Sequence, residues 1–229
     1  QMNINEKEPN AKVRDRFVLS KGHCSPALYS TLARKGYFEK ERLLTFRNIE
    51  SNLQGHPDMN KVPGVDMTSG SLGQGLSVAN GMALASKLNG DGYRVYCLLG
   101  DGEIEEGQVW EAAMTSNKYK LDNLCVIVDN NNLQIDGKIE EVKGLTNIGD
   151  KFKSFGFEVL QIDGNNIEEL LNAFNVAKQI KGRPTVIIAK TIKGKGVSFM
   201  ENKVEWHGRA PKEEEYKQAI EELSKKYAM

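Results

Sequence analysis

The sequence has few cysteines and no excess of charge of either sign, and each of these absences excludes a class of protein. Its three cysteines, Cys24, Cys97 and Cys125, are scattered and lack a Cys-x-x-Cys spacing. They predict free thiols in a reducing compartment, which we take to be the cytoplasm, rather than a disulfide framework or a zinc site. Lys and Arg total 31, as do Asp and Glu, so we expect neither nucleic acid nor an anionic membrane as a partner.

Long hydrophobic runs, repeats and linkers are also missing. The longest apolar runs, such as 124–128 and 185–189, are far too short to span a bilayer. The chain opens with Gln1, and its first residues lack the charged and apolar regions of a secretory signal. With only 6 prolines among 229 residues and no low-complexity tract, residues 1–229 are expected to form a single domain with a substantial core.

Short apolar segments alternate with helix-like segments along this chain. Strands are predicted over 16–20, 93–100, 123–130, 157–164 and 184–191, and their near-continuous apolar character is typical of strands covered on both faces. Helices are predicted over 25–36, 72–88, 106–119, 167–182 and 212–227, the last lying on the surface. The alternation predicts an α/β fold of three layers, a mostly parallel sheet with helices on both faces.

Local signals mark some of the expected helix ends. Ser25 and Pro26 suit the N-cap and the first position of the first predicted helix. Gly36 and Gly182 suit the ends of the helices that precede them.

Polar residues follow two successive predicted strands. Gly100-Asp101-Gly102 ends one strand and Asn130-Asn131-Asn132 ends the next. Gly-Asp-Gly alone is also an ordinary turn signal. In a parallel sheet, however, ligands bind beyond the carboxyl ends of strands, and a right-handed crossover brings such ends together. Mg²⁺ prefers a few protein oxygens combined with substrate phosphates, so the pattern predicts a site for a divalent cation and a diphosphate.

These motifs, with others in the same order, resemble the N-terminal region of transketolase, in particular its separately encoded N-terminal subunit. The resemblance covers nearly the whole chain and implies a thiamine-diphosphate-binding fold. It is carried by "DRFVLSKGHCSPALYS", "GHPDMNKVPGVDMTSGSLGQGLSVANGMALA", "GDGEIEEGQVWEAAM", "VDNNNLQIDG" and "AKTIKGKGVSFMEN…WHGRAP".

The resemblance implies thiamine diphosphate and Mg²⁺, or Ca²⁺ or Mn²⁺ in its place, as cofactors. Asp101 and Asn131 would bind the metal through their side chains, and Leu133 through its backbone carbonyl. Gly102 would contact the diphosphate through its backbone. The loop 68–75 would carry the residues that flank the aminopyrimidine, Gly70, Ser71 and Leu72. Without the resemblance, this loop is interpreted as the glycine-rich start of a helix, and helix N-termini also bind anions.

Three histidines are the only ones in the chain, and each has a glycine neighbour. A lone histidine is more often structural, but all three lie in motifs that resemble transketolase. The resemblance places His23 and His207 beside the diphosphate and the substrate oxygens, and His56 beside the hydroxyl or carbonyl of the donor. The pKa of an imidazole lies near neutral pH, which suits hydrogen bonding and proton transfer near pH 7.

Other charged residues leave two interpretations open. Glu106 and Glu111 form a solvated acidic helix start or, by the resemblance, a carboxylate chain at a dimer interface that links two cofactors. Lys190, Lys193 and Lys195 either border the phosphate entrance or are ordinary solvated lysines.

The resemblance implies transfer of a two-carbon ketol group from a ketose phosphate to an aldose phosphate, a reaction of the pentose phosphate pathway. The family's pyrimidine-binding domain, with its cofactor-contacting glutamate and phosphate-binding arginines, has no counterpart after residue 212. We therefore expect a C-terminal partner subunit in an α₂β₂ assembly, and no activity without it. An upstream "SGHPG"-like segment of the family is likewise not matched by residues 1–15, which puts cofactor retention and donor binding in question.

Three alternative functions fit the sequence less well. Part of a deoxyxylulose-phosphate synthase or a 2-oxo acid dehydrogenase is disfavoured by "SKGH", "GHPD" and "WHGRAP", the motifs that resemble transketolase. A non-catalytic interaction subunit that kept the fold is disfavoured by the intact Asp101 and Asn131. An NAD-dependent oxidoreductase fails because the glycine order from Gly70 to Gly75 is not the dinucleotide fingerprint.

Overall fold

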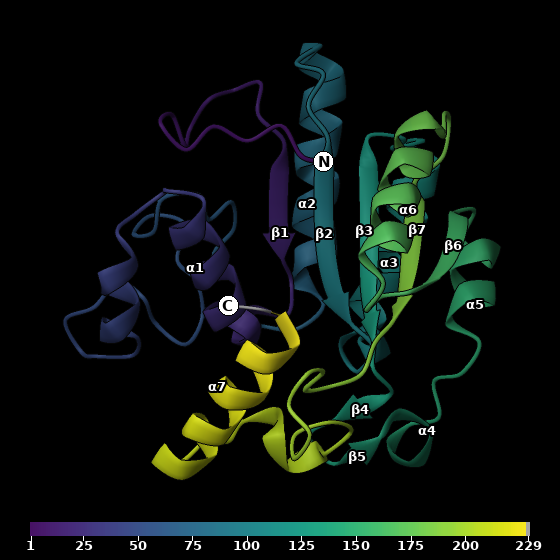
Figure 1. Ribbon diagram of the computed structural model, residues 1–229. Coiled ribbons are helices and arrows are strands. Elements are labelled where there is room, and N and C mark those ends of the chain that lie inside the picture. The colour runs from purple at the N-terminus through teal and green to yellow at the C-terminus, as the bar shows by residue number, and fades with distance from the viewer. Residues whose placement is uncertain (228–229) are drawn as a thin grey trace.

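A five-stranded parallel sheet forms the centre of the molecule in the computed structural model, which describes residues 1–227 (Figure 1). The spatial order is β1-β2-β3-β7-β6, and every neighbouring pair is parallel. The strands are β1 (Arg16–Leu19), β2 (Val95–Gly100), β3 (Leu124–Asn130), β7 (Thr185–Lys190) and β6 (Glu158–Asp163). Each lies inside its predicted range, so the parallel α/β fold expected from the sequence is confirmed.

Helices cover both faces of the sheet, which explains why its central strands are apolar along their length. On one face, α2 (Gln74–Asn89), α3 (Gly107–Lys118) and α5 (Ile148–Ser154) bury side chains such as Cys97 and Leu99. On the other, α6 (Ile167–Gln179) covers Tyr96 and Ile127. Successive strand residues point to opposite faces, so a strand between two helical layers needs apolar side chains at every position.

Two helix ends differ from the sequence prediction. The helix α1 (Ser25–Arg34) takes Cys24 as its N-cap, while the Ser25 hydroxyl donates to the carbonyl of Gly55 at 2.8 Å. Ser25 is therefore the first helical residue and not the cap, because a tertiary acceptor claims its side chain. Helix α6 stops at Gln179 and is followed by an extended Ile180, so Gly182, with φ of 73°, lies beyond the helix end. Gly36, with φ of 87°, follows α1 as predicted.

Several short elements were not predicted, because they span too few residues for a hydrophobic period. They are the 3-10 helices Gly22–Cys24, Lys40–Thr45, Glu103–Glu105 and Val204–His207, the strands β4 (Leu133–Gln134) and β5 (Gly137–Lys138), and the helices α4 (Ile139–Val142) and α5 (Ile148–Ser154). The described part of the chain ends in α7 (Glu213–Tyr227), in which Ala219 is the buried residue. Within residues 1–227, no helix has the length and hydrophobicity that a membrane span requires.

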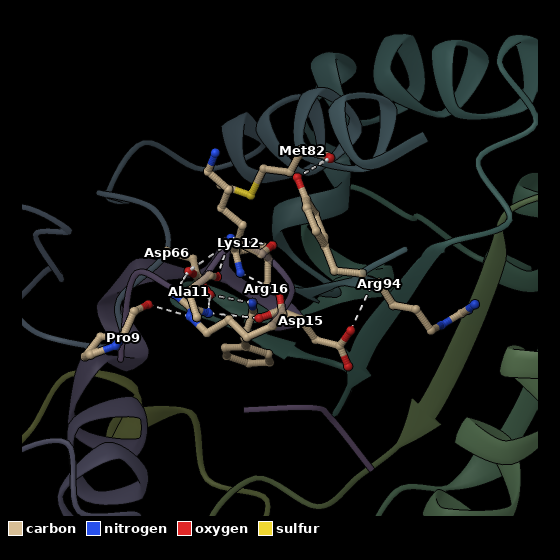
Figure 2. Close-up of polar contacts among 11 residues, drawn as sticks. Pro9, Ala11, Lys12, Asp15, Arg16, Asp66, Met82 and Arg94 are labelled. Carbon is tan, nitrogen blue, oxygen red and sulfur yellow. Dashed lines mark hydrogen bonds and ion pairs between the residues drawn. The ribbon is translucent and has the colours of Figure 1, made fainter. Parts of the chain in front are cut away.

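Buried polar contacts hold the chain at the amino-terminal edge of β1 and β2 (Figure 2). The Asp15 carboxylate accepts hydrogen bonds from the backbone N–H groups of Asn3 and Arg94, both at 2.8 Å. The Asp66 carboxylate accepts from the Arg14 guanidinium and from the N–H of Phe17. Both carboxylates are almost fully buried, so this edge is a fixed base for the strands whose opposite ends form the candidate site.

Candidate active site at the carboxyl edge of the sheet

The carboxyl ends of β2 and β3 lie side by side. Gly100, the last residue of β2, is in register with Asp129 of β3. The backbone N–H of Asp101 continues the pairing by donating to the carbonyl of Asp129 at 3.2 Å. The two polar strand ends recognised in the sequence therefore meet at one sheet edge.

Asp101 is a buried carboxylate, with only 2% of its surface exposed. One of its oxygens accepts from the N–H of Gly102 at 2.9 Å, and the other from the N–H of Asn132 at 2.5 Å and the Asn130 amide at 3.2 Å. Burial raises the pKa of Asp101 above its usual value, although these hydrogen bonds act in the opposite direction. A nearby cation would favour the ionised form of this carboxylate.

The turn after β3 carries the other two predicted metal ligands. The side-chain oxygen of Asn131 accepts from the N–H of Leu133 at 3.0 Å, and Asn132 between them has a left-handed φ of 63°. Among residues 1–227 there is no group of three or more His, Cys, Asp or Glu that could hold a metal. A cation here would rest on one carboxylate with amide and carbonyl oxygens. That donor set fits Mg²⁺, which completes its shell with phosphate and water.

Gly102 lies close to the side chain of Gln134 in the β4–β5 hairpin. A Cβ added at this position would lie 2.8 Å from the side-chain oxygen of Gln134 in β4. The glycine therefore allows the β4–β5 hairpin to pack against the end of β2.

Two lysines, Lys21 and Lys193, lie near the carboxylates of Asp101 and Asp129 at the strand ends. The Lys21 ammonium forms an ion pair with Asp129 at 2.6 Å, and the Thr191 hydroxyl also donates to Asp129. Burial alone would lower the pKa of Lys21, but the charge of Asp129 holds it above its usual value. Burial followed by repulsion from Lys21 lowers the pKa of Lys193. The Lys21–Asp129 pair was not predicted from the sequence, because it joins residues far apart in the chain.

The other two lysines considered from the sequence are placed differently. Lys190 ends β7 with an exposed side chain, and Lys195 pairs with Glu201 at 3.7 Å. Of the three lysines, the structure thus brings Lys193 to the strand-end carboxylates.

His23 and His207 stack on each other, with ring centroids 5.2 Å apart. His23 keeps an exposed surface, but partial desolvation of its ring, followed by the charges of His207, Lys21 and Lys193, lowers its pKa to about 4. Burial and the same two lysines also lower the pKa of His207, whose Nδ1 is buried and has no hydrogen-bond partner in the described part of the chain. Two neutral imidazoles, one with an unsatisfied nitrogen, suit a polar ligand at this edge.

The third histidine, His56, lies against the glycine loop 68–75. A Cβ on Gly70 would lie 3.5 Å from the ring of His56, so this exposed imidazole packs on the loop backbone. A Cβ on Gly22 would lie 2.6 Å from the Ser69 hydroxyl and 3.0 Å from the nitrogen of Gly70. The "SKGH", "GHPD" and "TSGSLG" motifs therefore meet, and Ser71 and Leu72 lie at the exposed side of their junction.

The start of α2 does not leave all its N–H groups free for an anion. Gly73 has a left-handed φ of 82°, and its N–H donates to the buried carboxylate of Glu103 at 2.9 Å. The N–H of Gly75 donates to the Ser20 hydroxyl at 3.1 Å. Side chains of the protein itself thus bind these N–H groups. Neither Glu103 nor Ser20 was predicted from the sequence to have this role.

Glu106 and Glu111 are both exposed. Glu106 precedes α3 and lies against Gly73, where an added Cβ would meet its own Cβ at 2.9 Å. Glu111 lines an open cleft of about 330 Å³ between α2 and α3, with Ser77, Gly81 and Tyr119. The structure therefore places Glu111 on a surface formed by two helices rather than among the strand-end groups.

The sequence matches the family described as "Transketolase, thiamine diphosphate binding domain" over residues 1–228. The chain belongs to the transketolase family. It is 45% identical over 219 residues to an apulose-4-phosphate transketolase subunit from Phocaeicola vulgatus, a match that covers 96% of this chain and 78% of that one. It is 46% identical over 227 residues to the 6-deoxy-6-sulfo-D-fructose transketolase subunit SqwG of a Clostridium species, covering 99% and 82%.

A solved transketolase has the same fold over this region. The crystal structure of transketolase from Campylobacter jejuni superposes with a TM-score of 0.92 at 38% identity, covering 97% of this chain and 36% of that one. The chain therefore spans about a third of that transketolase and most of the subunit relatives. The resemblance to transketolase, and to its N-terminal subunit in particular, is confirmed.

Proposed function

We propose that the chain is the thiamine-diphosphate-binding subunit of a divided transketolase and acts with a C-terminal partner subunit in an α₂β₂ assembly. The proposed reaction moves a two-carbon ketol group from a ketose phosphate to an aldose phosphate, as in the pentose phosphate pathway. The single observation that supports the reaction best is the meeting of Asp101, the Asn131–Leu133 turn and two neutral histidines at one sheet edge.

The residues of this edge suit separate parts of the cofactor. Asp101, Asn131 and the carbonyl of Leu133 offer oxygens to Mg²⁺, and Lys21 and Lys193 bring positive charge to the diphosphate side. The bound cofactor supplies the carbanion chemistry of ketol transfer. The protein's part is to hold and orient the reactants and to exclude water.

The histidines suit the proton-handling part of the reaction. Because their pKa values are lowered, His23 and His207 stay neutral near pH 7 and offer both a donor and an acceptor nitrogen. His56, on the exposed side of the loop, would contact the sugar hydroxyl or carbonyl of the donor.

The proposed substrate class is taken from the names of the relatives. The two subunit relatives carry the names of apulose-4-phosphate and of 6-deoxy-6-sulfo-D-fructose, which specify a phosphate and a sulfo group respectively. Both groups are anionic. We propose an anionic ketose as the donor.

Isothermal titration of thiamine diphosphate with Mg²⁺ into the chain plus its cognate partner tests this function. We expect binding together with ketol transfer, and loss of Mg²⁺-dependent binding in Asp101→Ala. Asp150→Ala, an exposed carboxylate of α5, is the control and should bind normally. Unchanged affinity in Asp101→Ala contradicts the metal assignment. Assembly without cofactor uptake would indicate a non-catalytic interaction subunit.

A further inference from the structure

Glu103 directly follows Gly100-Asp101-Gly102 and contacts the start of α2 in the second glycine motif. It follows β2 in a short 3-10 helix and is 3% exposed. Its Oε1 accepts from the Ser20 hydroxyl and from the N–H of Gly73, the latter at 2.9 Å. Its Oε2 accepts from the N–H of Gly100 at 3.0 Å. One carboxylate thus joins the ends of β1 and β2 to the start of α2.

Ser20 extends this connection by one hydrogen bond. Its hydroxyl donates to Glu103 and accepts from the N–H of Gly75 at 3.1 Å. A Cβ on Gly75 would come within 2.3 Å of the same hydroxyl, so the helix start is packed directly against the end of β1. The loop 70–75 is therefore held at its helical end by a buried pair of side chains.

A carboxylate is the group that this arrangement requires. Three donors point at Glu103, and an ionised carboxylate only accepts hydrogen bonds. A glutamine of the same shape would turn an NH₂ group toward a donor, and a buried donor left without an acceptor is costly. Its contacts join segments distant in sequence, so Glu103 acts between elements and not as a local helix cap.

We propose that Glu103 is a positioning residue for the cofactor loop. By fixing Gly73 and Gly75 against the strand ends, it sets the place of Gly70–Leu72 relative to Asp101 and thereby the affinity for thiamine diphosphate. This inference rests on the proposed function, since it assigns Glu103 to the cofactor site of that function.

The test compares Glu103→Gln with Asp15→Asn in complex with the C-terminal partner. Asp15 is a matched control because it is also a buried carboxylate that accepts two backbone N–H groups, but at the opposite edge of the same strands. In the cofactor-free complex, Glu103→Gln should speed amide hydrogen exchange locally, at residues 70–76 and Gly100. Its dissociation constant for thiamine diphosphate with Mg²⁺ should rise on the order of 10- to 100-fold, the range found for outer-shell partners of metal sites. Asp15→Asn should change neither.

Each outcome decides the inference. The inference is overturned if Glu103→Gln has the same amide hydrogen exchange and cofactor affinity as the wild type. It is also overturned if exchange rises throughout the chain, as in any destabilised variant. If Glu103→Gln fails to fold, Ser20→Ala replaces it and should give the same local pattern with a smaller loss of affinity. If the wild-type complex itself takes up no cofactor, the proposed function fails, while exchange at Gly73 and Gly75 still decides whether Glu103 fixes the loop.

Discussion

At the scale of single residues, close backbone approach determines the shape of the site. Gly22 lies so near the loop 69–70 that a methyl group there would overlap both a hydroxyl and a backbone nitrogen. Backbone atoms cannot move aside as the end of a flexible side chain can, so this contact depends on the absence of a Cβ.

Gly22→Ala should therefore lower the free energy of unfolding of the isolated chain by about 1–3 kcal/mol, the usual cost of overpacking, and weaken cofactor binding. Gly81→Ala is the control, because a Cβ at this position in α2 has no neighbour within 4 Å. It should raise stability by about 0.5–1 kcal/mol, the advantage of alanine over glycine in a helix. Chemical denaturation measures both, and equal stability of the two variants would contradict the packing argument.

The charge state of His23 gives a second prediction at this scale. Its pKa of about 4 in the folded chain lies below the usual 6.5, so the unfolded chain takes up the proton first as the pH falls. The stability that this difference contributes is complete above about pH 6.5 and is lost as the pH falls toward 4. The NMR shifts of the histidine rings, assigned with His23→Asn, should show His23 neutral from pH 5.5 to 8. A titration midpoint of His23 near pH 6.5 would contradict the lowered pKa.

At the scale of elements, helix starts differ in where their hydrogen bonds come from. Helix α6 has a local cap, because the side chain of Asn166 accepts from the N–H groups of Glu168 and Glu169. Helix α2 has none of its own and instead uses Ser20 and Glu103 from other segments. A local cap affects only the stability of its helix, whereas the long-range one also positions the site.

Asn166→Ala should accordingly lower the free energy of unfolding by about 1 kcal/mol, the typical value of an N-cap, with cofactor affinity unchanged. Asn172→Ala, on the exposed surface of the same helix, serves as its control. It should be neutral or slightly stabilising, because alanine is the better helix former. Urea denaturation of the pair checks the difference, and similar stabilities would remove the capping role of Asn166.

At the scale of the whole molecule, a buried ion pair ties the first residues of the chain to the segment that leads into the glycine loop. Arg14 and Asp66 are each less than a tenth exposed, and the N–H of Phe17 also donates to Asp66. This contact joins the residues just before β1 to the segment that precedes the glycine loop 68–75. The Arg16 guanidinium lies beside the same Asp66 carboxylate (Figure 2).

Asp66→Ala should cost about 3–5 kcal/mol, because it leaves the Arg14 guanidinium buried without its partner. Lys61→Ala removes one member of an exposed pair, whose atoms are 3.9 Å apart, and should change stability by at most about 1 kcal/mol. Thermal unfolding of both variants makes the comparison. A loss in Asp66→Ala no larger than in Lys61→Ala would show that the buried pair does not hold these segments together.

Local pattern in the sequence was sufficient to predict the strands, the longer helices and the meeting of the two polar strand ends. The apolar runs that became β2 and β3 end in Gly100-Asp101-Gly102 and Asp129-Asn130-Asn131, and parallel pairing must bring such ends together. These features depend on residues near one another in the chain, and a hydrophobic period or a turn residue records them directly.

Contacts between distant segments became known from the folded chain alone. Folding took Ser25 away from its expected capping role, paired Lys21 with Asp129, stacked His23 on His207 and brought Ser20 and Glu103 to the start of α2. Residue order is enough to say where strands end and which groups stand there. Which of those groups face one another depends on strand order and loop packing, and no short stretch of residues encodes either.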